Sequence, residues 1–213
     1  MIAPHYLRTV ETLYEPGDFV ELRGWTKKHD AYVGIYTIDD LPCAMQALDQ
    51  LDGEDALDLY LCLNPTTLEP RPFRGGAKGT WEHEVESRRW FLLDGDTVTA
   101  DKHIATDDEI ARTMDTMRAA KGWLIEQGFE QVVLANSGNG VHLLTRCDLP
   151  NDRDSKQLIR CVQNAVAKRF SDVYTKIECF PDANRIVRAY GTLNRKGTER
   201  PGLSWRRSGI VES

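Results

Sequence analysis

The stretch RRWFLLDGD, residues 88–96, decides the fold. Its short apolar run predicts a buried strand over Arg89–Asp94. Because side chains alternate along a strand, Asp94 and Asp96 point to one face with Cα atoms roughly 6–7 Å apart. Two carboxylates so placed can bind one divalent cation or bridge a pair. An isolated Asp-x-Asp pair at a strand end is also typical of turns, where Asp bonds the local backbone.

Helical and strand patterns alternate downstream of this stretch. Thr106 to Glu109 has capping-box spacing and predicts a helix that runs to about Gln127, where Gly128 suits the end. Further elements are expected as strands at 131–135 and 141–146, a helix at about 154–170, and strands at 176–180 and 185–190. The order β-α-β-β-α-β from Arg89 onward is that of a split βαβ, RRM-like antiparallel sheet.

The upstream half has a second set of elements. They are expected as strands at 19–25, 31–37 and 58–63 and a helix at 41–51. The stretch 65–79 (PTTLEPRPFRGGAKG) is rich in Pro, Gly and Thr, and it predicts a long loop. We therefore expect one α+β domain over residues 1–213, with an N-terminal α/β subdomain (1–80) packed on an RRM-like subdomain (81–213).

Composition narrows the class of protein. No apolar run of about 18 residues and no leader pattern is present, so we expect a cytoplasmic protein without membrane contact. The five cysteines are scattered without a Cys-x-x-Cys pair, so neither a disulfide framework nor structural zinc is expected. The formal charge is −6, but the stretch 185–213 carries seven Lys and Arg against two Glu. A polyanion should therefore meet the C-terminal stretch.

A glycine-rich reversal is the second candidate feature. Residues 137–142 (SGNGVH) present the Ser137 hydroxyl, backbone N–H groups and the His142 imidazole together. Such a turn can cradle a triphosphate. Asn139-Gly140 is equally a strong hairpin signal, with His142 packing on the sheet, and both interpretations stay open.

The third feature is an acidic strand followed by two arginines. Glu178 lies in the apolar strand KIECF (176–180), and Arg185 and Arg188 follow. Being three residues apart, the arginines share a face only where the chain bends, and there both could reach one phosphate chain. A solvated charged edge is the alternative.

In this order the three features resemble the archaeo-eukaryotic primase superfamily, in the primase-polymerase branch of phage and plasmid replication proteins. The matching motifs are Asp-x-Asp after an apolar strand, Ser-Gly-x-Gly-x-His at 137–142, and an acidic residue ahead of Arg-Ile-x-Arg-x-x-Gly-Thr-x-Asn-x-Lys at 185–196. They span about half of the chain. The resemblance implies a template-directed nucleotidyltransferase with two divalent ions, Mg²⁺ or Mn²⁺.

The resemblance also assigns expected roles residue by residue. The expected metal ligands are Asp94, Asp96 and Glu178, which together with His142 form the expected catalytic set. The expected nucleotide contacts are Ser137, Gly138, His142, Arg185, Arg188, Asn194 and Lys196. The implied partners are a single-stranded DNA template, a primer strand, nucleoside triphosphates and a helicase domain or subunit.

Two positions depart from the family pattern. The family usually has an Asp about eight residues before the first arginine, whereas Glu178 stands seven before Arg185, with Asp182 and Asp172 as rivals. Gly95 stands where an apolar residue is more usual, which adds backbone freedom. These departures leave room for a non-catalytic nucleic-acid-binding module. A metal-dependent nuclease is a third interpretation of Asp-x-Asp with a histidine.

Overall fold

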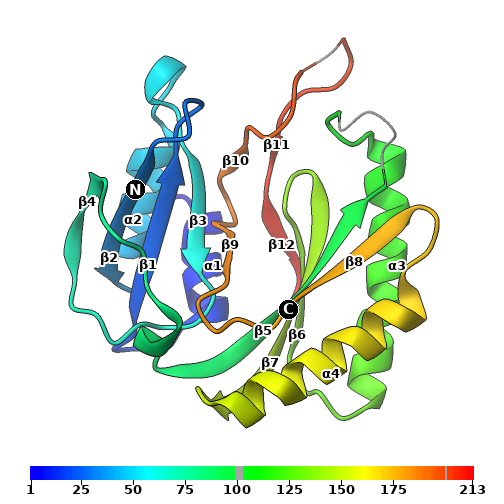
Figure 1. Ribbon diagram of the computed structural model, residues 1–213. Helices are drawn as coiled ribbons and strands as arrows, with labels where there is room; N and C mark the ends of the chain where they lie inside the picture. Colours follow the sequence, from blue (N-terminus) through cyan, green and yellow to red (C-terminus); the bar gives the residue numbers. More distant parts are fainter. Residues whose placement is uncertain (99–102, 200) are drawn as a thin grey trace.

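The computed structural model describes residues 1–98, 103–199 and 201–213, and it has the α+β architecture expected from the sequence, with two five-stranded antiparallel sheets side by side (Figure 1). The N-terminal sheet has the order β4-β2-β1-β3-β9. Its strands are β1 (Phe19–Trp25), β2 (Ala31–Thr37), β3 (Asp58–Cys62), β4 (Arg71–Gly75) and β9 (Ile186–Arg188). Helices α1 (Pro4–Leu13) and α2 (Leu41–Asp49) pack with it, and short 3-10 turns occur at η1 (Gly53–Asp55) and η2 (Glu82–Glu84).

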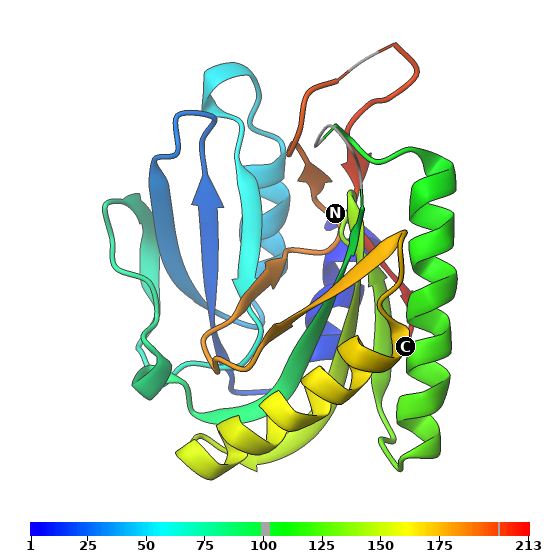
Figure 2. The same cartoon turned by 45° about the vertical axis from the view of Figure 1, so that its right-hand side comes forward.

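The second sheet has the order β12-β6-β7-β5-β8. Its strands are β5 (Ser87–Thr97), β6 (Val132–Asn136), β7 (Gly140–Pro150), β8 (Thr175–Phe180) and β12 (Gly209–Glu212). Helices α3 (Asp107–Glu126) and α4 (Arg153–Phe170) lie along its outer side (Figure 2). Because β7 lies between β5 and β6, and β5 between β7 and β8, the predicted split βαβ arrangement is confirmed.

The alternation along β5 explains why the sheet is covered on both faces. Phe91 and Leu93 point into the core beneath α3 and α4. Trp90 and Leu92 point the other way, into a core shared with the N-terminal sheet, α1 and α2. Asp94 and Asp96 continue the Trp90 and Leu92 face, so they leave this shared core where the two sheets face each other.

The capping box predicted for α3 is confirmed. The Thr106 hydroxyl accepts from the Glu109 N–H at 3.2 Å, and the Glu109 carboxylate accepts from the Thr106 N–H at 2.7 Å. Two backbone donors at the helix start are thereby satisfied, which stabilises the start of α3. A long, apolar, membrane-crossing helix is not found in the described ranges.

Three segments differ from the sequence prediction. The predicted loop at 65–79 contains β4, which pairs with β2 while Phe73 stacks on Tyr32 with ring centroids 5.7 Å apart. Helix α1 was not predicted, although its buried residues Tyr6, Val10 and Leu13 follow a helical spacing. The chain after β8 crosses to the N-terminal sheet as β9, forms a short ribbon of β10 (Leu193–Asn194) with β11 (Arg206–Arg207), and returns as β12.

Candidate active site

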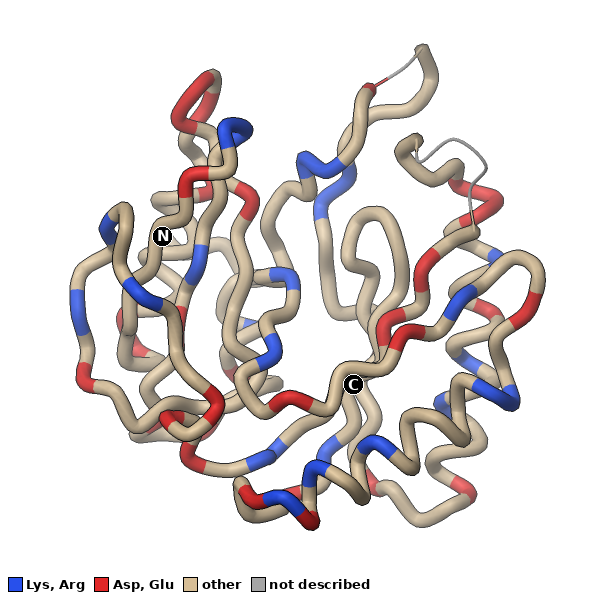
Figure 3. Tube along the Cα trace, in the orientation of Figure 1, with Lys and Arg blue, Asp and Glu red and all other residues tan. Residues whose placement is uncertain are grey.

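Three adjacent strands place a row of polar side chains on one face of the second sheet. Asp94 on β5 stands directly opposite His142 on β7 and Glu178 on β8. Directly opposed residues in an antiparallel sheet have Cα atoms about 4.5–5.5 Å apart. Figure 3 shows the acidic segments of β5 and β8 side by side. Two carboxylates predicted from separate motifs are therefore neighbours.

Asp94 lies at the centre of this row. Its side chain is 18% exposed, its Oδ1 is 3.3 Å from His142 Nε2, and its Oδ2 is 3.9 Å from Arg185 Nη2. Burial by itself raises the pKa of Asp94, but His142 and Arg185 stabilise the charged form, and the net effect lowers the pKa below its usual value. Asp94 is therefore a carboxylate at neutral pH.

Asp96, two residues on, has a different electrostatic environment. Burial raises the pKa of Asp96 to about 6, and the negative charges of Asp94 and Glu178 add to the rise. Negative charge is thus concentrated here beyond what the surrounding cations neutralise. A bound cation would relieve this repulsion, and carboxylate oxygens are the ligands that Mg²⁺ and Mn²⁺ favour, so the donor set fits divalent ions.

The three candidates for the third carboxylate lie in different places. Glu178 is beside Asp94 and pairs with Lys176 on its own strand. Asp182 instead pairs with Lys156 of α4 at 2.7 Å. Asp172 caps the turn into β8, accepting from two backbone N–H groups at 2.7 and 2.8 Å. Of these candidates, only Glu178 lies in the row with Asp94.

The carboxylates are adjacent but not yet gathered around one point. Within residues 1–98, 103–199 and 201–213, no three His, Cys, Asp or Glu side chains are close enough to hold a metal ion as they stand. Glu178 is held by Lys176 and is partly exposed. Rotation of this side chain away from Lys176 would be needed for the three carboxylates to share ions.

The glycine-rich turn between β6 and β7 adjoins the carboxylates. Gly138 has a φ of +97°, which favours glycine, and a Cβ built there would lie 2.6 Å from the Asn194 Cβ. The Ser137 N–H donates to the Gly140 carbonyl at 3.0 Å, closing the turn. A Cβ built on Gly140 would be 3.5 Å from the Ser137 hydroxyl and 3.6 Å from an Asp96 oxygen. The predicted turn therefore places the serine hydroxyl near the acidic row.

His142 is held from behind by a buried tyrosine. Its Nδ1 is 2.7 Å from the hydroxyl of Tyr190, a fully buried side chain. Burial raises the pKa of Tyr190 well above its usual value, so the hydroxyl keeps its proton and can donate to Nδ1. In that arrangement Nε2 carries the ring proton and points to Asp94. Tyr190 was within a predicted strand, but nothing in the sequence pattern indicated this role.

The two motif arginines behave differently. Arg185 stacks on Phe180, with its guanidinium carbon 3.4 Å from the ring centroid, and faces Asp94. Its buried Nε has no hydrogen-bond partner among the residues that the structure describes. Arg188 is nearly fully buried and donates to the Asp58 carboxylate and the Tyr60 hydroxyl, both at 2.8 Å. Arg185 is therefore available to an anion, whereas Arg188 is already engaged.

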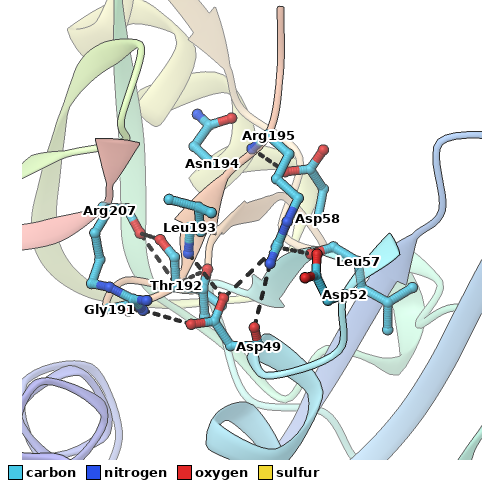
Figure 4. Close-up of polar contacts among 12 residues, drawn as sticks. Asp49, Asp52, Leu57, Asp58, Gly191, Thr192, Leu193, Asn194, Arg195 and Arg207 are labelled. Carbon is cyan, nitrogen blue, oxygen red and sulfur yellow. Dashed lines mark hydrogen bonds and ion pairs between the residues drawn. The ribbon is translucent and has the colours of Figure 1, made fainter. Parts of the chain in front are cut away.

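The last motif is fixed by a buried carboxylate of α2. Asp49, whose side chain is 2% exposed, accepts from the Leu193 N–H at 3.0 Å and from Arg207 Nη1 at 2.5 Å (Figure 4). The adjoining Asn194 donates to the Ser137 carbonyl at 2.8 Å and accepts from the Lys196 N–H at 2.9 Å. The ribbon is thus tied both to α2 and to the glycine-rich turn. Nothing in the sequence pattern indicated Asp49.

These side chains surround a narrow cavity of about 150 Å³ between the two sheets. Its lining includes six predicted site residues, two from each of the three motifs: Asp94, Asp96, Ser137, His142, Arg185 and Arg188. Asn194, Lys196 and Tyr60 also line it. Glu178 and Gly138 lie beside it rather than in its wall. The structure therefore gathers residues from 94 to 196 around one space.

Comparison with known proteins finds two solved structures of similar fold. No family model and no curated protein sequence matches the chain. The crystal structure of primase RepB′ is similar with a TM-score of 0.54 at 13% identity, covering 98% of this chain and 56% of its own. The polymerase domain of Mycobacterium tuberculosis Ligase D, in complex with DNA, is similar with a TM-score of 0.53 at 16% identity, covering 91% and 75%. The chain therefore shares its fold with these two structures, which is the fold that the motif resemblance predicted.

The similarity to RepB′ extends over almost the whole chain, which spans 56% of the length of the RepB′ chain. In the shared fold the acidic row, the glycine-rich turn and the ribbon with Asn194 meet at the junction of the two sheets. The Gly95 departure also has a physical reason. A Cβ at Gly95 would lie 2.8 Å from the Met117 sulfur on α3 and 2.9 Å from the Val141 carbonyl. Glycine therefore permits the close approach of α3 to β5, and the position is packed rather than loose.

Proposed function

We propose that the chain is a template-directed nucleotidyltransferase of the primase-polymerase kind, joining nucleoside triphosphates on a DNA template in replication of a phage, plasmid or similar element. The observation that supports this most is the row of His142, Asp94 and Glu178 across three strands, with Asp96 beside it. The fold shared with a primase and a polymerase domain supports the same reaction class. Residues 1–213 would act as one catalytic domain.

In this proposal Asp94, Asp96 and Glu178 hold two divalent ions, Mg²⁺ or Mn²⁺. When bound, such ions lower the pKa of the attacking 3′-hydroxyl and neutralise charge on the triphosphate and the leaving group. His142 orients the Asp94 carboxylate through Nε2 and is itself oriented by Tyr190. This support keeps the Asp94 carboxylate in place before substrate arrives.

The phosphates are assigned to the part of the cavity that is lined by Arg185, Ser137 and Lys196. The Arg185 guanidinium has a buried, unpartnered Nε and faces the acidic row, so a phosphate oxygen would complete its hydrogen bonds. The Ser137 hydroxyl and the exposed Lys196 ammonium supply further donors. Arg188 would reach a phosphate only by leaving Asp58, so we assign it to the wall that supports Tyr60.

The proposed reaction is an in-line displacement at the α-phosphorus. The 3′-oxygen of the growing strand forms the new phosphodiester bond while the bond to the β-phosphate oxygen breaks, and pyrophosphate leaves. Arg185, Ser137 and Lys196 fix the triphosphate so that the α-phosphorus faces the acidic row. The chain contributes position and charge rather than a covalent intermediate.

Incubation with single-stranded template, labelled nucleotides and Mg²⁺ or Mn²⁺, with and without primer, tests the proposal. We expect wild-type protein to add nucleotides and release pyrophosphate, and the double variant Asp94→Asn, Asp96→Asn to do neither. The matched control is Asp182→Asn, because this carboxylate pairs with Lys156 away from the row.

Circular dichroism of each variant separates loss of activity from loss of fold. Synthesis that persists in the folded double variant would refute the proposed metal ligands. Wild-type protein that binds DNA yet adds no nucleotide in either metal would instead favour the non-catalytic module. Nucleotide-independent cleavage of the strand would identify a nuclease.

A further inference from the structure

A second cavity opens at the tip of the β1–β2 hairpin. It has a volume of about 430 Å³, within the range of about 300–1,000 Å³ that is common for ligand sites. Its wall includes Trp25 and Lys27 from the hairpin and Arg195 from the segment after β10. It shares Tyr60 and Lys196 with the active-site cavity. The two spaces therefore adjoin each other, with these two side chains in both walls.

The active-site cavity is the narrower of the two, at about 150 Å³ against about 430 Å³. The phosphate-directed residues Arg185 and Ser137 lie in its wall. A strand that pairs with the nucleotide would extend beyond this wall, and the hairpin cavity adjoins it through Tyr60 and Lys196.

The second cavity is lined by both aromatic rings and cations. The rings of Trp25 and Tyr60 meet edge to face, with centroids 4.9 Å apart. Lys27 Nζ also lies 5.3 Å from the Trp205 ring centroid, and Trp205 Nε1 donates to the Gly197 carbonyl at 3.1 Å. The hairpin and the segment that carries Trp205 are thereby joined by a cation–π contact.

The charge of this cavity favours a polyanion. Lys27 and Lys196 line it as exposed cations, and the guanidinium of Arg195, which also lines it, is mostly buried 3.8 Å from Asp49. The single carboxylate in the lining, Asp58, pairs with Arg188 at 2.8 Å. Figure 3 shows basic segments on both sides, at the hairpin tip and along the β10–β11 ribbon. In the neighbouring acidic turn at 53–55, Glu54 pairs with Lys28 at 3.1 Å, and both side chains are exposed. Lys27, and not Lys28, lines the cavity.

We propose that this cavity binds an unpaired nucleic-acid strand and leads it to the active site, with a base against the Trp25 and Tyr60 rings and a phosphate at Lys27. Stacking on aromatic rings beside cations is how proteins hold single strands without sequence preference. The occupant extends beyond one nucleotide, because the cations continue outward from Lys196 to the exposed hairpin tip. The inference rests on the proposed function for the identity of the strand as template.

Binding of a fluorescent 12-nucleotide single strand, measured by anisotropy without triphosphate or metal, tests this inference. We expect Trp25→Ala to weaken binding by about 5- to 160-fold, the range for loss of one stacked base. Lys27→Glu should also weaken it and reduce the slope of log affinity against log salt by roughly 0.7 per lost phosphate contact. The matched controls are Trp81→Ala and Lys168→Glu, because both side chains are exposed and outside the cavity.

Several outcomes decide the matter. Equal binding by Lys27→Glu and Lys168→Glu would overturn the proposal even if Trp25→Ala failed to fold. If Trp25→Ala and Lys27→Glu lost binding of a mononucleotide but kept binding of the strand, the cavity would be assigned to the incoming nucleotide instead. Protein that holds the strand through Trp25 and Lys27 yet adds no nucleotide would refute the proposed function and leave this site standing. If wild-type protein extends a primer, and Trp25→Ala and Lys27→Glu both bind the strand as wild type does, the proposed strand site is refuted and the proposed function is not.

Discussion

Replacement of Asp49 by alanine tests whether one buried carboxylate fixes the C-terminal motif segment to the N-terminal half. The Asp49 side chain is 2% exposed and accepts from the Tyr6 hydroxyl at 2.9 Å and the Leu193 N–H at 3.0 Å. It also pairs with Arg207 at 2.5 Å and lies 3.8 Å from the mostly buried Arg195 (Figure 4). Burial first and this carboxylate second raise the pKa of Tyr6 to about 12, so the hydroxyl keeps its proton and donates to Asp49.

The expected loss follows from these contacts. Each hydrogen bond to a charged acceptor contributes about 1.5–3 kcal/mol. Removal of one partner from a buried ion pair costs about 3–5 kcal/mol, because the remaining charge stays buried, and here that charge is Arg195 (9% exposed) rather than Arg207 (48% exposed). The contributions overlap, so we expect Asp49→Ala to lower the free energy of unfolding by about 3–5 kcal/mol. For a chain of this size that corresponds to a fall in Tm of roughly 6–20 °C.

Urea and thermal unfolding followed by circular dichroism measure this loss. The matched control is Asp39→Ala, an exposed aspartate that should change stability by less than about 0.5 kcal/mol. In a double-mutant cycle with Arg207→Ala, the coupling energy should fall within about 0.5–3 kcal/mol. A loss in Asp49→Ala no larger than in Asp39→Ala would refute the view that Asp49 holds the two halves together.

Three further predictions follow from the site and its surroundings. Glu178→Gln should reduce nucleotide addition by about 100-fold, equivalent to roughly 3 kcal/mol of transition-state stabilisation, whereas Asp182→Asn should leave it unchanged. Equal primer-extension rates in these two variants would show that Glu178 is not part of the site. Gly95→Ala should cost about 1–3 kcal/mol in urea unfolding, because its Cβ meets Met117 and a backbone carbonyl, and an unchanged midpoint would contradict the packing argument. Burial alone would raise the pKa of Glu82, but its bonds to Lys156 and Arg88 lower it below 4.5, so its contribution to stability should be present above pH 4.5 and disappear as the pH falls further. Glu82→Gln should flatten that part of the stability profile, and identical profiles would argue against it.

The sequence by itself predicted the second sheet well. Its order of elements, the capping box at Thr106 and the glycine turn at 137–140 are local patterns, so a short window of residues contains the information. The motif resemblance named residues that the structure then placed around one cavity. The strand β4 was missed because its pairing with β2 outweighs a composition of Pro and Gly that favours loops.

The third carboxylate shows the limit of sequence reasoning. Glu178, Asp182 and Asp172 were all near the expected spacing, and only strand register put Glu178 opposite Asp94 while Lys156 and a turn took the others. Likewise, the crossing of β9 into the N-terminal sheet brings Arg188 to Asp58, so that Arg185 is the arginine that stays available to an anion.

Local propensity and side-chain alternation thus determined the elements and the motif positions, because they depend on neighbours in the chain. The support of His142 by Tyr190, the Asp49 anchor and the cavity at the hairpin tip were decided only by tertiary structure. These features join residues that are far apart in sequence, and no periodicity encodes which distant side chains meet.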